Sequence, residues 1–205
     1  MEIKAADVKA LRDATGAGMM ECKKAIAEAG GDMDKAKQIL RERGLASAKK
    51  LSERAAGEGV VEAYLHQPDP TLPPKVGVLV ELNCATDFVA KTEGFRTLAR
   101  NLALHVAASR PEYLSREEVP AGVIERETEI YRKEAEAQNK PAAAMEKIVE
   151  GKLRAFYEER VLLNQIYVRA EDGKTTIAEM LDSAAAEMKE PVRVRRFARF
   201  RVGGE

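Results

Sequence analysis

Few side chains in this sequence stand where they could do catalytic chemistry. The only histidines, His66 and His105, have no serine, cysteine or aspartate partner at a spacing typical of nucleophilic catalysis. The two cysteines, Cys22 and Cys84, form no C-x-x-C pair, so neither a zinc site nor a disulfide framework is indicated. The glycine-rich stretch TGAGMM lacks the Lys-Ser/Thr pair of a phosphate-binding loop. We therefore expect a protein that is not an enzyme and that has no cofactor and no metal of its own.

Four residues stand at the junction where an apolar run gives way to a helical pattern: Thr86, Asp87, Phe88 and Val89. Thr86 is a favourable N-cap, and Asp87 suits the positive end of a helix dipole. Phe88 comes seven residues before Phe95, so helical periodicity favours a buried ring. If the first turn overhangs the sheet edge, the ring is exposed instead. The pattern leaves both possibilities open.

A pair of methionines, Met19 and Met20, follows the glycine-rich stretch and opens another helical pattern. Adjacent residues of a helix point about 100° apart, so a small bundle can hardly bury both side chains. We expect one of them to be exposed, because methionine suits adaptable binding surfaces. The alternative, in which both fill a loose core, is less favoured.

The tail VRVRRFARFRV alternates as a strand does, with one apolar face (Val192, Val194, Ala198, Phe200 and Val202) and one basic face (Arg193, Arg195, Phe197, Arg199 and Arg201). Arginines around an aromatic ring could bind RNA by phosphate contacts and stacking. A charged outer face that discourages edge-to-edge aggregation is the simpler interpretation. The chain has 34 basic and 34 acidic side chains, and zero net charge offers no bulk attraction to nucleic acid. Binding to RNA or the ribosome through this strand therefore remains the alternative function.

The first part of the chain has helical periodicity. Residues 3–44 predict three short helices, separated by the glycine-rich stretch and by Gly30-Gly31. Asp32 is expected to cap the third helix and Gly44 to end it. The Ala/Lys-rich residues 47–57 are expected to form a partly helical linker. This predicts an N-terminal helical domain (1–46), a linker (47–57) and a core domain (58–205).

The core domain begins with two strand patterns around the proline-rich loop 67–75, with apolar faces at Val61, Ala63 and Leu65 and at Val76, Val78, Val80 and Leu82. Helices are predicted over 87–108, near 120–138, near 142–163 and after the capping box of Thr176 and Glu179. The fold class is therefore α+β, with a small three-stranded antiparallel sheet packed with helices. No apolar run approaches the roughly 18 residues of a membrane helix, and the charged start lacks a signal-peptide core, which favours a cytoplasmic protein with no membrane partner.

Four segments of the sequence, taken together and in order, resemble the elongation factor Ts family: LRDATGAGMMECKKAIAEAGGDMDKA, VGVLVELNCATDFVAK, HVAASRPEYL and NKPAAAMEKIVEGKLRAFYEE. The resemblance implies a guanine-nucleotide exchange factor whose partner is elongation factor Tu. It also implies a ubiquitin-associated-like N-terminal domain. Thr86-Asp87-Phe88-Val89 would correspond to the segment that enters the GTPase domain and dislodges Mg²⁺. The residues Leu11, Met19, Met20 and Lys23 would form the N-terminal patch that grips a helix of the same domain.

The chain departs from longer family members because it has room for only one core module. It therefore resembles the short form, which implies a homodimer. Four side chains opposite the main apolar stripes could form the dimer face: Val60, Tyr64, Leu79 and Phe197. Two local departures are the long loop HQPDPTLPPK and Ile166-Tyr167, where the family usually has Pro-Phe.

Overall fold

The computed structural model describes residues 3–15, 17–52, 55–67, 69–138 and 141–203. The chain divides into two compact units. Unit 1 comprises residues 1–59, 83–90 and 181–193, and unit 2 comprises residues 60–82, 91–180 and 194–205. No helix within the described ranges is long and apolar enough to cross a membrane. The domain boundaries expected from the sequence stay a prediction.

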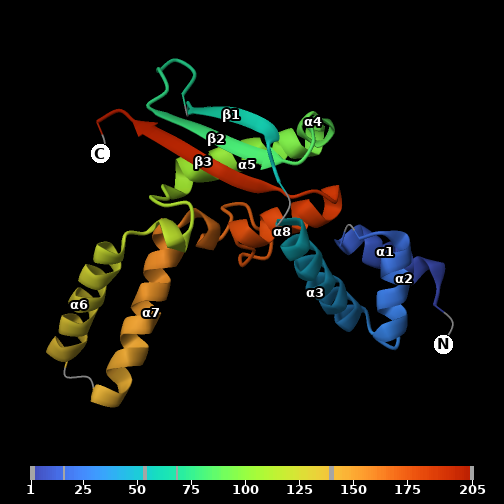
Figure 1. Cartoon of the computed structure of the whole chain (residues 1–205), viewed down its shortest axis with the longest axis horizontal. Coiled ribbons are helices and arrows are strands. Elements are labelled where there is room, and N and C mark those ends of the chain that lie inside the picture. The colour runs from blue at the N-terminus through green and yellow to red at the C-terminus, as the bar shows by residue number, and fades with distance from the viewer. Residues whose placement is uncertain (1–2, 16, 53–54, 68, 139–140, 204–205) are drawn as a thin grey trace. The chain divides into compact units, whose positions relative to one another are not determined.

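The first three helices of unit 1 are α1 (Ala5–Thr15), α2 (Met19–Glu28) and α3 (Met33–Ser52), and each contacts the other two (Figure 1). Their core is one cluster of buried side chains: Val8, Leu11, Cys22, Ala25, Ile26, Ala36 and Leu40. Gly30 and Gly31, both with positive φ, end α2. The Asp32 carboxylate then accepts hydrogen bonds from the backbone N–H groups of Asp34 (3.0 Å) and Lys35 (3.1 Å). The predicted three-helix bundle and its Asp32 cap are confirmed.

The predicted end of the third helix at Gly44 is wrong, because α3 continues to Ser52. Glycine inside a helix is unfavourable by only about 1 kcal/mol relative to alanine. It ends a helix when the chain turns there into a left-handed conformation, as it does at Gly30. The helix therefore runs through the start of the expected linker.

The sheet has the order β1-β2-β3, with β1 at Glu58–His66, β2 at Val76–Cys84 and β3 at Arg193–Arg201. Within unit 2, helix α5 (Glu93–Ser109) lies along one face of this sheet (Figure 1). The side chains of Val78, Val80 and Leu82 are buried on the face that α5 covers. The α+β class and the three-stranded antiparallel sheet are confirmed.

The expectation that Val61, Ala63 and Leu65 belong to the covered face of the sheet is wrong, because all three are exposed. The neighbouring Glu62 carboxylate lies 3.5 Å from the Arg100 guanidinium on α5, so the even-numbered residues of β1 face the helix. Both faces of β1 carry apolar side chains. Alternation along the strand therefore cannot tell which face the helices cover.

The rest of unit 2 is helical. Helices α6 (Ala121–Ala137) and α7 (Ala142–Arg160) pack against each other, near the 3₁₀ turns η1 (Arg116–Glu118) and η2 (Leu162–Asn164). The loop residues Ile166-Tyr167 pair with the strand-like Thr175-Thr176, where the Tyr167 N–H donates to the Thr175 carbonyl (2.9 Å).

Helix α8 (Ile177–Met188) begins with the predicted capping box. Thr176 N–H donates to Glu179 Oε2 (3.0 Å), and Glu179 N–H donates to Thr176 Oγ1 (3.2 Å). Both partners lie within one helical turn, so the start of this helix could be predicted from the sequence. The helix leads to the chain reversal before β3.

Candidate partner-binding site

The 86–89 segment caps and forms a short helical turn of its own, separate from the long helix that follows. A single turn, α4 (Asp87–Ala90), follows β2, and α5 starts anew at Glu93. The hydroxyl of Thr92 caps α5 by accepting from the Phe95 N–H (3.3 Å). The single helix predicted over 87–108 is therefore wrong. The break removes the periodic relation between Phe88 and Phe95, so the Phe88 ring is 79% exposed.

Thr86 holds the start of α4. Its hydroxyl accepts from the Val89 N–H (3.4 Å), and its carbonyl accepts from the Ala90 N–H (3.2 Å), as expected for an N-cap. The buried Cys84 thiol donates to the Thr86 carbonyl (3.1 Å). Burial raises the pKa of this thiol, so it stays protonated and can donate. Asp87 lies half-buried in the first turn.

Sequence reasoning missed Glu190, which contacts this segment. Its carboxylate accepts hydrogen bonds from the Ala85 N–H (3.1 Å), the Thr86 N–H (3.0 Å) and the Thr86 hydroxyl (2.6 Å). The partners are 104 and 105 residues apart in sequence. No local pattern predicts such a contact.

The methionine pair, Met19 and Met20, is exposed at the start of α2, by 58% and 64%. The sequence predicted one exposed methionine, and the structure exposes both. Lys23 is exposed one turn further along the helix. The expectation that Leu11 belongs to the exposed patch is wrong, because Leu11 is fully buried in the bundle core. Its helical spacing from Val8 places both side chains on the core face of α1.

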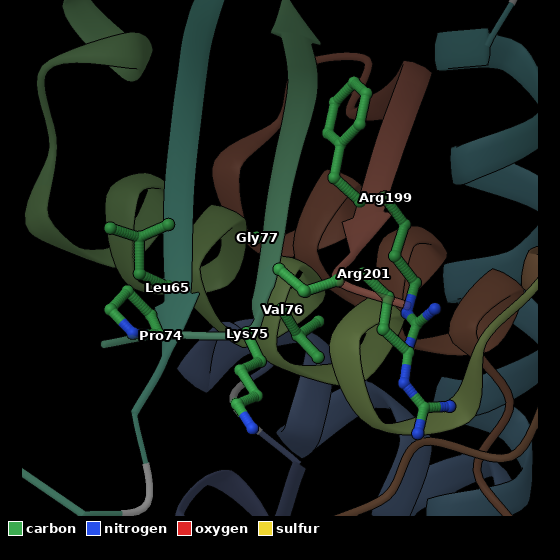
Figure 2. A pocket seen from close by; sticks show the side chains of 9 residues that line it. Leu65, Pro74, Lys75, Val76, Gly77, Arg199 and Arg201 are labelled. Carbon is green, nitrogen blue, oxygen red and sulfur yellow. The ribbon is translucent and has the colours of Figure 1, made fainter. Parts of the chain in front are cut away.

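The uncovered face of the sheet, which we call the outer sheet face, carries large exposed apolar side chains from all three strands and from the residue after β3: Val61, Leu65, Leu79, Phe200 and Val202. Their exposed fractions run from 45% at Leu79 to 71% at Val202. A shallow depression at one end of the sheet is lined by Leu65, Gly77 and Phe200, among others (Figure 2). A side chain at position 77 would meet Leu65 Cδ2 at 3.2 Å, so the glycine lets Leu65 lie across β2.

The prediction that four side chains lie on the uncovered face is therefore mostly wrong. Of the four, Leu79 is exposed, whereas Val60, Tyr64 and Phe197 are half-buried. One ion pair crosses the outer sheet face, between Arg196 and Glu81 (2.7 Å). The apolar stripe of β3 that ends in Phe200 and Val202 thus faces outward at its C-terminal end rather than into the core.

The two histidines form no acid–base pair. His105 is fully buried, and its Nε2 lies 2.9 Å from Gln165 Oε1, while its Nδ1 accepts from the Val168 N–H (3.2 Å). Burial lowers the pKa of this imidazole and favours its neutral form. These contacts give His105 a structural role. In the described ranges, no three His, Cys, Asp or Glu side chains are grouped so that they could hold a metal ion.

On the basic face of β3, the Arg199 guanidinium lies close to other positive charges. Arg199 Nε is buried and has no hydrogen-bond partner, and burial, followed by the nearby charges of Arg110 and Arg201, lowers the Arg199 pKa. Figure 2 shows Arg199 and Arg201 extending to the same side of the strand. Phe197, the ring expected to stack on a base, is half-buried. The ring that the RNA-binding alternative would use is thus not exposed, and the exposed Phe200, between these arginines in sequence, lies on the opposite face of the strand.

The methionine pair, Phe88 and the outer sheet face expose large apolar side chains on an α+β fold, a feature typical of proteins that bind other macromolecules. The family model described as Elongation factor TS matches residues 4–204. The chain belongs to the elongation factor Ts family, and its role is in translation elongation.

Relatives named Elongation factor Ts match almost the whole chain. The relative from Coprothermobacter proteolyticus is 52% identical over 203 residues, which is 99% of this chain and 100% of the relative. The relative from Moorella thermoacetica is 51% identical over 201 residues, covering 98% and 96%. The relative from Pseudothermotoga lettingae is 51% identical over 205 residues, covering 100% of both.

Proposed function

We propose that this protein is a guanine-nucleotide exchange factor that binds elongation factor Tu in its GDP form and promotes GDP release. The observation that carries the proposal is the Phe88 ring, which is 79% exposed on a single helical turn whose start is held by hydrogen bonds from Cys84 and to Glu190. An exposed ring on a fixed backbone is suited to insertion into a partner. Membership of the elongation factor Ts family supports the choice of partner.

The proposed mechanism needs no chemical step by this chain, and we propose that it is not an enzyme. Phe88, with Thr86, Asp87 and Val89, enters the GTPase domain and displaces Mg²⁺ from the nucleotide. Removing the metal removes a large positive charge that holds the phosphates, so GDP leaves faster. By linkage, the protein weakens GDP binding by the same factor as GDP weakens binding of the protein.

The methionine pair and Lys23 supply a second contact, to the same GTPase. Flexible, polarisable methionine side chains adapt to an apolar helix face, and Lys23 can contact an acidic group beside it. Two separate contacts let one hold the complex while the other acts on the nucleotide site. The cytoplasm, where translation takes place, is the compartment we expect.

We also propose that the protein is a homodimer through the outer sheet face. Isolated apolar side chains on a surface need no explanation, but this face carries them on all three strands. Pairing with the same face of a second copy would bury Val61, Leu79 and Phe200 away from water.

The test of exchange is stopped-flow release of fluorescent GDP from elongation factor Tu, with and without this protein. A concentration-dependent acceleration of release is expected. Release at the intrinsic rate at all concentrations would refute the proposal. Binding to RNA that weakens steeply with salt, with no effect on GDP release, would favour the alternative of an RNA- or ribosome-binding protein.

A further inference from the structure

Glu190 lies in the chain reversal between α8 and β3, far in sequence from the 86–89 segment. We infer that Glu190 is a positioning residue for nucleotide exchange, because it fixes the backbone from which Phe88 projects. The inference rests on the proposed function of Phe88. It assigns a role in exchange to a residue that would contact neither the nucleotide nor the Mg²⁺ of the partner GTPase.

Three hydrogen bonds converge on the Glu190 carboxylate. Glu190 Oε2 accepts from two successive backbone N–H groups, those of Ala85 and Thr86, and Oε1 accepts from the Thr86 hydroxyl. All three are charge-assisted and between 2.6 and 3.1 Å long, which is the stronger class of hydrogen bond. The third bond also orients the Thr86 hydroxyl, which accepts from the Val89 N–H.

The 86–89 segment depends on such external support. An isolated helix shorter than about 12 residues is marginal in water, and α4 has only 4 residues. The Phe88 ring is too exposed to hold its own place by packing. Its direction therefore follows from the backbone at Thr86, immediately before the helical turn.

Glu190 is itself held on both sides. Lys189, directly after α8, has a left-handed conformation with φ of 57°, which turns the chain out of the helix. Pro191 is fully buried and restricts the backbone on the other side. The carboxylate thus projects from a short stretch with little freedom, as a positioning group requires.

A carboxylate is suited to this place because it only accepts hydrogen bonds. In a Glu190→Gln variant the amide oxygen can still accept from the two backbone N–H groups. Its NH₂ group then faces the Thr86 hydroxyl and can only donate to it. The conservative variant should therefore keep part of the function, whereas Glu190→Ala removes all three bonds.

The experiment measures GDP release from elongation factor Tu at increasing concentrations of the full-length variants. For Glu190→Ala we expect the maximal release rate to fall about tenfold with little change in the half-saturating concentration, because the methionine pair still binds. Glu190→Gln should lie between Glu190→Ala and wild type. Glu187→Ala, which removes an exposed carboxylate from the same end of α8, is the matched control and should behave as wild type.

A double-mutant cycle with Phe88→Ala separates positioning from general support of the fold. If Glu190 acts through Phe88, then Glu190→Ala should have little further effect in the Phe88→Ala background. Exchange of the Ala85 and Thr86 amide hydrogens should also become faster in Glu190→Ala, and to a smaller extent in Glu190→Gln, whose neutral amide oxygen is a weaker acceptor than the carboxylate. This readout needs no partner.

Failure of the proposed function and failure of the positioning role give different results. A wild-type protein that does not accelerate GDP release overturns the proposed function. An active wild type with undiminished rates in both Glu190 variants overturns the positioning role, as does an equal loss in the presence and absence of Phe88. If Glu190→Ala does not fold, the comparison rests on Glu190→Gln, and wild-type rates with unchanged amide exchange there overturn the inference.

Discussion

Phe88 and Phe95 lie seven residues apart on consecutive helices, yet Phe95 is fully buried and Phe88 is 79% exposed. The difference arises at Thr92, where the helix restarts. Phe95 belongs to the core under the sheet, and Phe88 belongs to a separate turn. Two identical side chains at helical spacing therefore have opposite environments.

Replacing either ring should give opposite phenotypes. Phe88→Ala should leave the free energy of unfolding nearly unchanged, because an exposed ring contributes little to the folded state. The GDP release from elongation factor Tu that this protein stimulates should become about tenfold slower or more. Denaturant unfolding and stopped-flow release measure the two effects. Phe95→Ala is the matched control and should lose about 3–5 kcal/mol of stability. A strongly destabilised Phe88→Ala, or a stable one with full exchange activity, would contradict the proposed wedge.

The methionine pair should act in binding and not in folding. Changing both Met19 and Met20 to serine should weaken binding to elongation factor Tu by about tenfold to a hundredfold, as measured by titration calorimetry. The thermal unfolding temperature should change little, since both side chains are exposed. In contrast, Leu11→Ala should destabilise the bundle by about 2–5 kcal/mol because Leu11 is buried. Unchanged affinity in the double variant would argue against this patch.

The outer sheet face should determine the oligomeric state. At micromolar concentration, light scattering should give about twice the chain mass of 22.5 kDa for the wild type. Leu79→Glu places a charge in the centre strand of the proposed interface and should give the monomer mass. Ile130→Glu, at a similarly exposed position on α6, should not change the mass. A monomeric wild type would refute the proposed dimer.

Stability should fall in mild acid because of His105. Burial lowers the pKa of its imidazole from the usual 6.5, so below that pH the unfolded chain binds a proton that the folded chain does not. The free energy of unfolding should therefore decrease as the pH falls below about 6.5. Urea unfolding between pH 5 and 8 measures the slope, and His105→Gln should reduce it. The same slope in wild type and variant would show that His105 does not cause it.

Local signals in the sequence were reliable where the physical cause is also local. Asp32 caps α3 and Thr176 pairs with Glu179 because both contacts close within three residues. The buried face of β2 followed from periodicity, since this strand has one clearly apolar face. The N-cap role of Thr86 belongs to the same group.

Other features depend on contacts between distant parts of the chain. Gly44 alone did not end α3, because a helix stop needs a turn of the backbone and not only a glycine. Strand β1 is apolar on both faces, so the side covered by α5 is decided by packing, and Val61 and Leu65 are left exposed.

The amino-acid sequence by itself determined the α+β class, the N-terminal bundle and the N-cap at Thr86. Only the tertiary structure decided that Leu11 supports the core, that Phe88 is exposed and that Glu190 holds the Thr86 backbone. The physical reason is that caps and periodicity act within a few residues. Burial and the partner of a carboxylate depend on which segments meet in space, as Glu190 and Thr86 do across 104 residues.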